Sequence, residues 1–528
     1  MLKYLFKRLV IGALSIVAAI ALVMLLIYSL MDRTQVFSKD PQFTRQSNNA
    51  RDSYMYGKWE EYGYLDCVLY TEWLQQLAAS GEIDEETRSA AAMFGRTQEE
   101  DSDIVKEYAA RFIEEYESQG YTILRKDAVI LGGRLAAGGA QIFFAHRDIS
   151  LASRLATYLK NLVTIDSIHY SEKNDPAGGV EDPGVTFTLY DPAYGGEKFS
   201  PAIIGNGTQH KYLLYFSSQF PYIHQNLATI QLGKSYSINK GVDVFTSMTR
   251  TQGSYILTET TFPTGLTEQA ADDLHTAIYA PGSLATSDFL RARYTDEYTN
   301  VDTVRQSYSK TGFSFIIGII STVLVYLLGV PLGILMAQHK DKLIDKIGTC
   351  YIIFISAVPS LAYIFMFRAI GSSVFGLPTT FDLEKSTRLM YVLPIISLAL
   401  PSIGGTMKWL RRYMIDQMNS DYVKFARSGG LTEREIFSKH ILKNAAIPIV
   451  NGIPGSILFA MTGAIITERI YSVPGAGGLL TEAISYYDNG VIVGLTLFYA
   501  VLSVISLVLG DILMSVVDPR ISFSTKDR

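Results

Sequence analysis

The amino-acid sequence predicts a polytopic α-helical membrane protein with six transmembrane helices and an inserted extracellular domain of the α+β class. Three observations lead to this fold class. Long apolar runs fill residues 1–31 and 311–528, the stretch 32–310 has the mixed composition of a soluble domain, and basic residues collect in alternate loops. The 528 residues therefore divide into an N-terminal segment with the first helix, an inserted domain, and a five-helix core.

The first apolar run is uncharged from Leu9 to Met31 and follows Lys3, Lys7 and Arg8. About 20 apolar residues are enough to cross the hydrocarbon core as a helix. A secretory signal peptide has a similar charged start, but its apolar segment is only about 7–15 residues long and ends in small residues. The length of this run and its end at Tyr28 to Met31 favour an uncleaved helix.

Five further apolar runs predict the remaining transmembrane helices. Pro401, Gly404 and Gly405 interrupt one of them, and such interruptions are tolerated where neighbouring helices satisfy the freed backbone groups. Six helices place both termini on the same side of the membrane. The predicted spans are Gly312–Ala337, Ile347–Ile370, Leu389–Met407, Ile447–Thr467 and Val491–Val517.

The distribution of charge predicts the orientation. The loops 339–346 and 408–446 are rich in Lys and Arg, and the two termini lie on the same side as these loops. Cytoplasmic loops carry this excess of basic residues. Residues 32–310 carry a net charge of −12 and the rest of the chain +7, so the inserted domain is expected outside the cell.

The inserted domain shows helix and strand signals. Residues 102–119 repeat apolar side chains at Ile104, Tyr108, Phe112 and Tyr116, between a Ser102 cap and Gly120, and predict a helix. The alternating segment 185–190 and the apolar segment 212–216 predict strands.

The sequence of the inserted domain shows no catalytic or nucleotide-binding pattern. Its histidines lack the spacing of metal ligands. The sequence Gly233-Lys234-Ser235 ends like a phosphate-binding loop, but that motif needs a glycine where Ala228 stands. The domain is therefore interpreted as an accessory or docking unit, and the chain is expected to bind no cofactor.

The basic segment 421–448 has the signals of two short helices joined by a turn. The first helix is expected to end at Arg427, before Ser428-Gly429-Gly430, and the second to begin at Thr432. Thr432 and Glu435 form a capping-box pattern. A compact helix–turn–helix of this kind suits insertion into a groove of another protein. The alternative is an ordinary basic loop at the membrane surface.

The order of residues in this segment resembles the coupling loop of the permease subunits of ATP-binding-cassette importers of type I. The family pattern Glu-Ala-Ala, Gly and Ile-x-Leu-Pro departs here at Lys424, Phe425 and Lys443. The form from Asp421 to Pro448 is similar to the oligopeptide and dipeptide branch, closest to streptococcal and lactic-acid-bacterial members with a large extracellular insertion. Agreeing segments are Gly329–Leu335, Pro359-Ser360, Leu393-Pro394, Tyr471–Gly477 and Asp518–Arg520.

This resemblance implies a transport subunit of the bacterial plasma membrane that is not an enzyme. The expected partners are a second homologous permease, two cytoplasmic ATPases that use ATP and Mg²⁺, an extracellular peptide-binding lipoprotein, an oligopeptide substrate and the lipid bilayer, with no nucleic acid. The residues expected to contact the ATPase are Ala426, Gly429, Gly430, Leu431, Glu433, Arg434, His440, Leu442 and Asn444.

The segment between the last two spans is expected to form an extracellular gate or docking loop at Pro474, Gly475 and Gly477. A plain connector is the alternative there. For the whole chain three other functions were weighed: a permease for dipeptides, nickel or glutathione, a membrane-anchored receptor or enzyme acting through residues 32–310, and an exporter subunit. An exporter normally carries long cytoplasmic helical extensions, which this sequence lacks.

Overall fold

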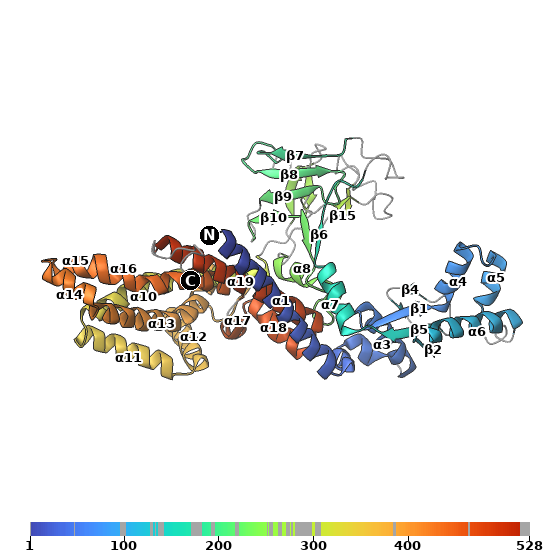
Figure 1. The fold of residues 1–528 in the computed structure, drawn as a ribbon, viewed down its shortest axis with the longest axis horizontal. Coiled ribbons are helices and arrows are strands. Elements are labelled where there is room, and N and C mark those ends of the chain that lie inside the picture. Colours follow the sequence, from blue (N-terminus) through green and yellow to red (C-terminus); the bar gives the residue numbers. More distant parts are fainter. Residues whose placement is uncertain are drawn as a thin grey trace.

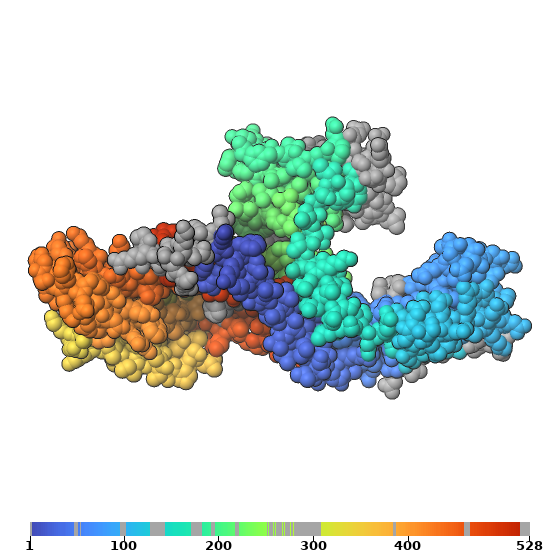
Figure 2. All heavy atoms as spheres, viewed as in Figure 1, coloured from blue at the N-terminus to red at the C-terminus, as the bar shows by residue number. Residues whose placement is uncertain are grey.

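A computed structural model gives an elongated molecule in which a helix bundle carries two lobes, both built from the inserted segment that the sequence predicts to be extracellular (Figure 1). In the space-filling view the two lobes stand apart from each other (Figure 2). The structure describes residues 2–517 except 47, 95–101, 127–129, 132–133, 136–141, 171–181, 192–195, 217–220, 251, 253–256, 262–266, 271–274, 276–277, 280–297, 301–307, 384–386 and 463–464.

The helix bundle confirms the predicted membrane architecture. Within the described residues, five helices are long and apolar enough to cross a membrane, or six when one bent pair counts as a single span. The bundle consists of α1 (Leu2–Leu30), α10 (Lys310–Gln338), α11 (Leu343–Ala357), α12 (Ser360–Phe375), α13 (Val392–Met418), α16 (Leu442–Thr462) and α19 (Asn489–Val517).

The predicted span Ile347–Ile370 is not one helix in the structure. It is the bent pair α11 and α12, whose axes meet at 109°. The helix stops because Pro359 cannot donate a backbone hydrogen bond and restricts the residue before it, Val358, to an extended conformation. A continuous apolar run carries no other sign of this bend.

Two other predicted boundaries are also corrected. Helix α13 runs through Pro401 without interruption and continues to Met418, beyond the predicted end at Met407. The predicted second short helix of the basic segment is not separate. It begins at Glu433, passes through a π-helical turn at Ile436–Ile441 and continues as α16, so that this span starts before Ile447.

Polar contacts join helices of the bundle at two places. At the start of α1, the Tyr4 hydroxyl donates to Asp511 of α19 at 2.9 Å, and Arg8 lies 3.2 Å from the same carboxylate. At the start of α11, the buried Asp345 accepts two hydrogen bonds from Arg411 of α13, at 2.5 and 2.7 Å. Such a two-bond pair sets both distance and orientation.

The first lobe is a three-stranded antiparallel sheet with helices packed against it. Its strand order is β1-β5-β2. The predicted helix 102–119 is α6, capped by the Ser102 hydroxyl. Its buried face differs from the prediction, because Val105 is buried and Ile104 is 41% exposed. The lobe contains η1 (Arg33–Phe37), α2 (Pro41–Arg45), α3 (Asn48–Glu61), β1 (Leu65–Leu69), α4 (Tyr70–Ala79), α5 (Glu85–Ala91), α6 (Asp103–Ser118), β2 (Thr122–Lys126), β3 (Ile130–Leu131), β4 (Arg134–Leu135) and β5 (Ile142–Asp148).

The second lobe is built on a four-stranded antiparallel sheet of order β10-β9-β8-β7. It confirms the predicted strand at 212–216 and places the other one slightly earlier, at Gly184–Thr188. The elements here and in the linking segments are α7 (Leu151–Lys160), β6 (Val163–Ile165), β7, β8 (Ala202–Asn206), β9 (Tyr212–Phe216), β10 (Ile223–Gln225), β11 (Ala228–Ile230), α8 (Val244–Thr249), β12 (Thr258–Thr261), β13 (Thr267–Ala270), β14 (Ile278–Tyr279) and β15 (Tyr298–Asn300).

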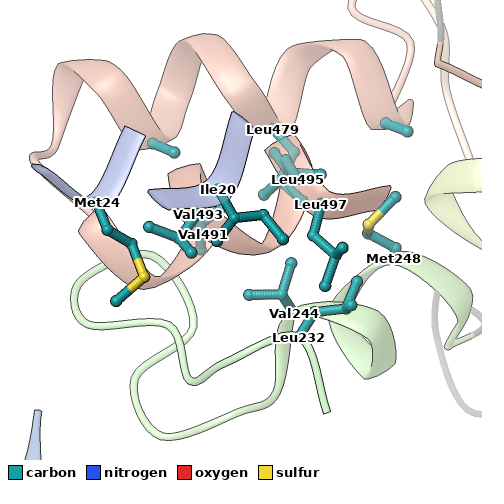
Figure 3. Packing of buried hydrophobic residues seen from close by; sticks show 12 residues of the cluster. Ile20, Met24, Leu232, Val244, Met248, Leu479, Val491, Val493, Leu495 and Leu497 are labelled. Atoms are coloured by element: carbon teal, nitrogen blue, oxygen red, sulfur yellow. The ribbon is translucent and has the colours of Figure 1, made fainter. Parts of the chain in front are cut away.

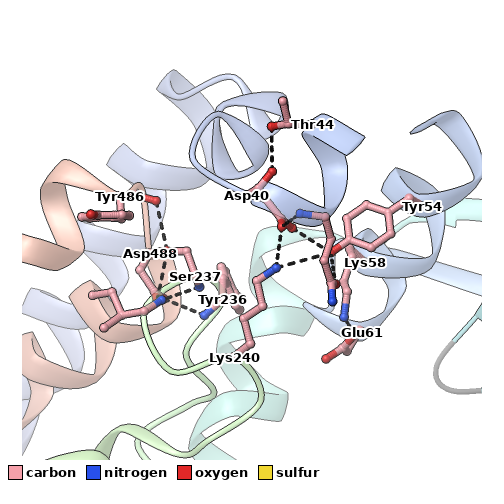
Figure 4. A network of polar contacts seen from close by, with 12 residues as sticks. Asp40, Thr44, Tyr54, Lys58, Glu61, Tyr236, Ser237, Lys240, Tyr486 and Asp488 are labelled. Atoms are coloured by element: carbon pink, nitrogen blue, oxygen red, sulfur yellow. Dashed lines mark hydrogen bonds and ion pairs between the residues drawn. The ribbon is translucent and has the colours of Figure 1, made fainter. Parts of the chain in front are cut away.

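A buried carboxylate joins the first lobe to the segment that follows β11 (Figure 4). Asp40 is 3% exposed and lies 2.6 Å from the Lys240 ammonium, and it accepts hydrogen bonds from the Tyr54 hydroxyl and the Gln42 N–H. Burial acts to raise the pKa of Asp40. The hydrogen bonds outweigh it, so that the pKa lies below its usual value.

A pH dependence follows from this pair. Because the folded-state pKa is lowered, the ionised Asp40 stabilises the fold at neutral pH, and this contribution is lost as the pH falls through the folded pKa, below about 4. We expect Lys240→Met to lower stability at pH 7 by about 3 kcal/mol, the lower end of the range for a broken buried pair, because the Lys240 side chain is 30% exposed. Thermal unfolding followed by fluorescence should show that the difference in stability between the variant and wild type decreases as the pH falls. A difference that stays constant from pH 7 to pH 3 would contradict this assignment.

Candidate functional site

The predicted turn in the basic segment is present as an elbow between α14 (Asp421–Ser428) and α15 (Glu433–Glu435). Gly430 has a φ of +83°, a left-handed conformation that glycine adopts without steric cost. The N–H of Leu431 donates back to the Ala426 carbonyl at 3.3 Å and closes the turn. The Thr432 hydroxyl and the Glu435 carboxylate then form the predicted capping box.

One face of the elbow belongs to the core of this chain. Val423 and Ala426 of α14 pack against Ile436 and Ile441 in the π-helical turn, together with α13 and α16. Ala426, one of the residues expected to contact the ATPase, is buried here and lets the two arms of the elbow approach each other. The elbow is therefore attached to α16 through both a covalent and a packed connection.

The other face of the elbow is open. Phe425 is 80% exposed and Leu431 37% exposed, and Gly429 and Gly430 lie between them. Aromatic side chains are enriched in protein–protein interfaces, which makes this exposed ring the candidate contact of the elbow. Phe425 was treated in the sequence as a departure from a family pattern. Its amphipathic position on α14, opposite the buried Val423, was the signal that could have found it.

The charged residues of the elbow already have partners within the chain. Arg427 donates to Glu433 at 2.6 Å, and Glu435 caps Thr432. Glu433, one of the residues expected to contact the ATPase, is held by Arg427 in this structure, and its contact with the ATPase stays a prediction. Among the other predicted contact residues, Arg434 is exposed, while His440, Leu442 and Asn444 are half-buried on the continuation of the helix.

The predicted extracellular residues lie in a buried turn rather than in an open loop. This turn joins α17 (Ile465–Tyr471) to α18 (Ala476–Ser485), and Gly475 and Gly477 are buried in it. The buried Glu468 carboxylate accepts from the Ser314 hydroxyl of α10 at 2.6 Å and from the Gly478 N–H at 3.2 Å. A Cβ at Gly475 would collide with this carboxylate.

Ser314 also ties the turn to α10 directly, because its hydroxyl oxygen accepts from the Ala476 N–H at 2.8 Å. Three helices thus meet at one carboxylate and one hydroxyl. Sequence reasoning missed Glu468 and Ser314, because they lie 154 residues apart and no local pattern links them. Among the described residues there is no group of three or more His, Cys, Asp or Glu side chains arranged to hold a metal ion.

Comparison with known proteins agrees with these features. The family described as binding-protein-dependent transport system inner membrane component matches residues 329–523. Over 100% of its length the chain is 34% identical to the oligopeptide transport system permease protein AmiC of Streptococcus pneumoniae, and 99% of that protein is covered. The chain belongs to the binding-protein-dependent transport permeases. As a member of this family, the permease is a membrane subunit of an ATP-binding-cassette transporter and not an enzyme.

Other relatives match a smaller part of the permease. The dipeptide transport system permease protein DppB of Lactococcus lactis subsp. cremoris is 28% identical over 42% of this chain and 73% of its own. The oligopeptide transport system permease protein AppB of Bacillus subtilis is 30% identical over 39% of this chain and 67% of its own. Residues 32–310 lie outside the family match and inside the full-length match to AmiC.

Proposed function

We propose that the permease takes up oligopeptides and forms half of the translocation pathway. Its full-length similarity to an oligopeptide transport permease supports this substrate class. The remaining subunits are a second homologous permease, two cytoplasmic ATPases that bind ATP and Mg²⁺, and an extracellular peptide-binding lipoprotein. The basic loops support a position of both termini and the elbow in the cytoplasm of a bacterial cell, and of residues 32–310 outside it.

The elbow is the proposed docking site for an ATPase subunit. Phe425 and Leu431 present an apolar surface on either side of the Gly429-Gly430 turn. Burying a phenylalanine side chain in a groove contributes about 2–3 kcal/mol. When the ATPases close on ATP, displacement of the elbow moves α16, because the helix is continuous from the capping box into the membrane. The docked contact must differ between the two states of the ATPase for this transmission to occur.

The turn at residues 474–478 is the proposed outer gate. Glu468 holds it against α10 through Ser314 and accepts from the Gly478 N–H, and the absence of a side chain at Gly475 leaves room for the carboxylate. Opening this end requires the hydrogen bonds of Glu468 to exchange partners. The gate is therefore expected to move as a unit with α17 and α18.

The test of the proposed function is co-purification of the ATPase together with uptake of a radiolabelled pentapeptide into proteoliposomes. We expect Phe425→Asp to reduce the affinity for the ATPase and the rate of peptide uptake by about 30-fold or more. This factor corresponds to the loss of about 2 kcal/mol from burial of the phenylalanine side chain. Lys424→Ala is the matched control, because Lys424 is exposed and pairs only with the exposed Asp421 in the same helix. The proposal fails if the wild-type chain retains no ATPase, and competition by dipeptides, glutathione or nickel in the same assay would reassign the substrate.

A further inference from the structure

The segment 232–250, called the arm below, leaves the sheet lobe and lies against the helix bundle. It contains α8 and follows β11. Its apolar side chains enter a cluster formed by α1, α18 and α19, in which each buried member is at most 4% exposed (Figure 3). The arm contributes Leu232, Val244 and Met248, and its neighbours are Ile20, Met24, Ala476, Leu479, Ala483, Val491, Val493, Leu495 and Leu497.

The backbone of the arm lies directly on two glycines of α19. A Cβ at Gly490 would collide with the Lys234 carbonyl group, and a Cβ at Gly494 would stand 2.5 Å from the Leu232 carbonyl oxygen. The two glycines are four residues apart and therefore share one face of the helix. Their missing side chains form a groove that the arm occupies.

A buried carboxylate fixes the arm at the start of this groove (Figure 4). Asp488 is 0% exposed and immediately precedes α19. It accepts from the Ser235 hydroxyl at 2.6 Å and from three successive backbone N–H groups of the arm, those of Tyr236, Ser237 and Ile238, at 2.8 to 3.1 Å. A carboxylate held by successive N–H groups is both strongly bound and precisely oriented.

The far end of the arm reaches the proposed gate. The Thr311 hydroxyl, at the start of α10, donates to the Met248 carbonyl at 2.6 Å. Beyond the arm, the Gln252 amide donates to the carbonyl of Pro474 at 3.1 Å. One extracellular segment therefore contacts the loop before α19, the start of α10 and the turn before α18. Ser314, which binds Glu468, lies one helical turn beyond Thr311.

We propose that the arm is the interface through which the extracellular domain controls the outer end of the pathway, with Asp488 as its positioning residue. The partner is the peptide-loaded binding protein, which docks on the extracellular domain. The arm transmits the effect of this docking to the gate. This inference rests on the proposed function. It gives residues 32–310 a role in the transport cycle instead of a purely structural one.

The test uses the complete complex of permeases and ATPases in lipid nanodiscs. ATP hydrolysis is measured alone and with the binding protein loaded with one pentapeptide. We expect Asp488→Ala and Gly494→Leu to keep the basal rate of ATP hydrolysis. The increase in this rate caused by the peptide-loaded binding protein should be about tenfold smaller than in wild type, which is a usual size for coupling between sites. The control Thr496→Ala removes a hydroxyl that bonds only within α19, to Ile492, and should behave as wild type.

Full stimulation in both variants, together with faster tryptic cleavage at Lys234 and Lys240, would overturn the proposal, because the arm would then be released without any effect on ATP hydrolysis.

If either variant fails to assemble, Ser235→Ala decides, since it removes one hydrogen bond to Asp488 and leaves the backbone donors in place. Unchanged stimulation in Ser235→Ala would count against the proposal, and a partial loss would support it. Failure of the wild-type complex to respond to peptide would instead refute the proposed function itself.

Discussion

Gly430→Val should abolish ATP-driven peptide uptake while leaving the chain folded in the membrane. The φ of +83° at this position is strained for any residue with a Cβ, by about 1–2 kcal/mol, and more for a β-branched one. A Cβ there would meet no atom within 4 Å, so the effect is confined to the backbone conformation. Relief of the strain requires the elbow to change its angle, and the exposed Phe425 and Leu431 then no longer face the same surface.

The neighbouring glycine supplies the matched control for this prediction. Gly429 has a φ of −76°, which any residue adopts, and a Cβ there would make ordinary contacts at 3.5 Å. Gly429→Ala should therefore retain uptake, whereas Gly430→Ala should lose a large part and Gly430→Val nearly all of it. Uptake and ATP hydrolysis are measured together in proteoliposomes. Equal activity of the two alanine variants would remove the conformational argument for the elbow.

The elbow was predictable because its signals are local. A pair of glycines followed by a capping box determines a turn and a helix start within a few residues, without help from the rest of the fold. The membrane helices were predictable for a similar reason, since each long apolar run satisfies its backbone internally. The structure adds the surface that surrounds the turn. Phe425 can be identified as the exposed candidate contact residue only when the buried face of α14 is known.

The bend between α11 and α12 and the docking of the arm are not visible as a hydropathy or periodicity pattern in the sequence. Pro359 lies in a run that is apolar on both sides, so that hydropathy continues across the bend. The arm is held by backbone N–H groups, by a carboxylate about 250 residues further along the chain and by the absence of side chains at Gly490 and Gly494. None of these contacts produces a periodic pattern, and their pairing exists only after folding.

Arg411→Ala is the second substitution expected to have a large effect, because it leaves Asp345 as a buried carboxylate without its cation. Asp345 is 3% exposed, and removal of one partner of a buried ion pair typically costs about 3–5 kcal/mol. The Arg411 side chain is 27% exposed, which places the expected loss near the lower end, about 3 kcal/mol. The same carboxylate accepts from the N–H of Asp341, whose φ of +64° is unusual for a residue with a side chain. The variant should therefore loosen both the turn before α11 and the extension of α13.

This extension leads directly from the membrane to the elbow, so the loss of Arg411 should lower the number of peptides transported per ATP as well as the melting temperature of the complex. Arg412→Ala is the matched control, because Arg412 is exposed and only stacks on Trp409, at 5.5 Å from the ring centre. Adding Asp345→Asn to Arg411→Ala removes the uncompensated charge and should restore most of the stability, whereas the coupling ratio stays low because the two-bond link is still absent. Equal melting temperatures for the Arg411 and Arg412 variants would show that water replaces the guanidinium without cost. If the double variant recovers both the melting temperature and the number of peptides transported per ATP, the unpaired charge of Asp345, and not the connection between α11 and α13, limits coupling.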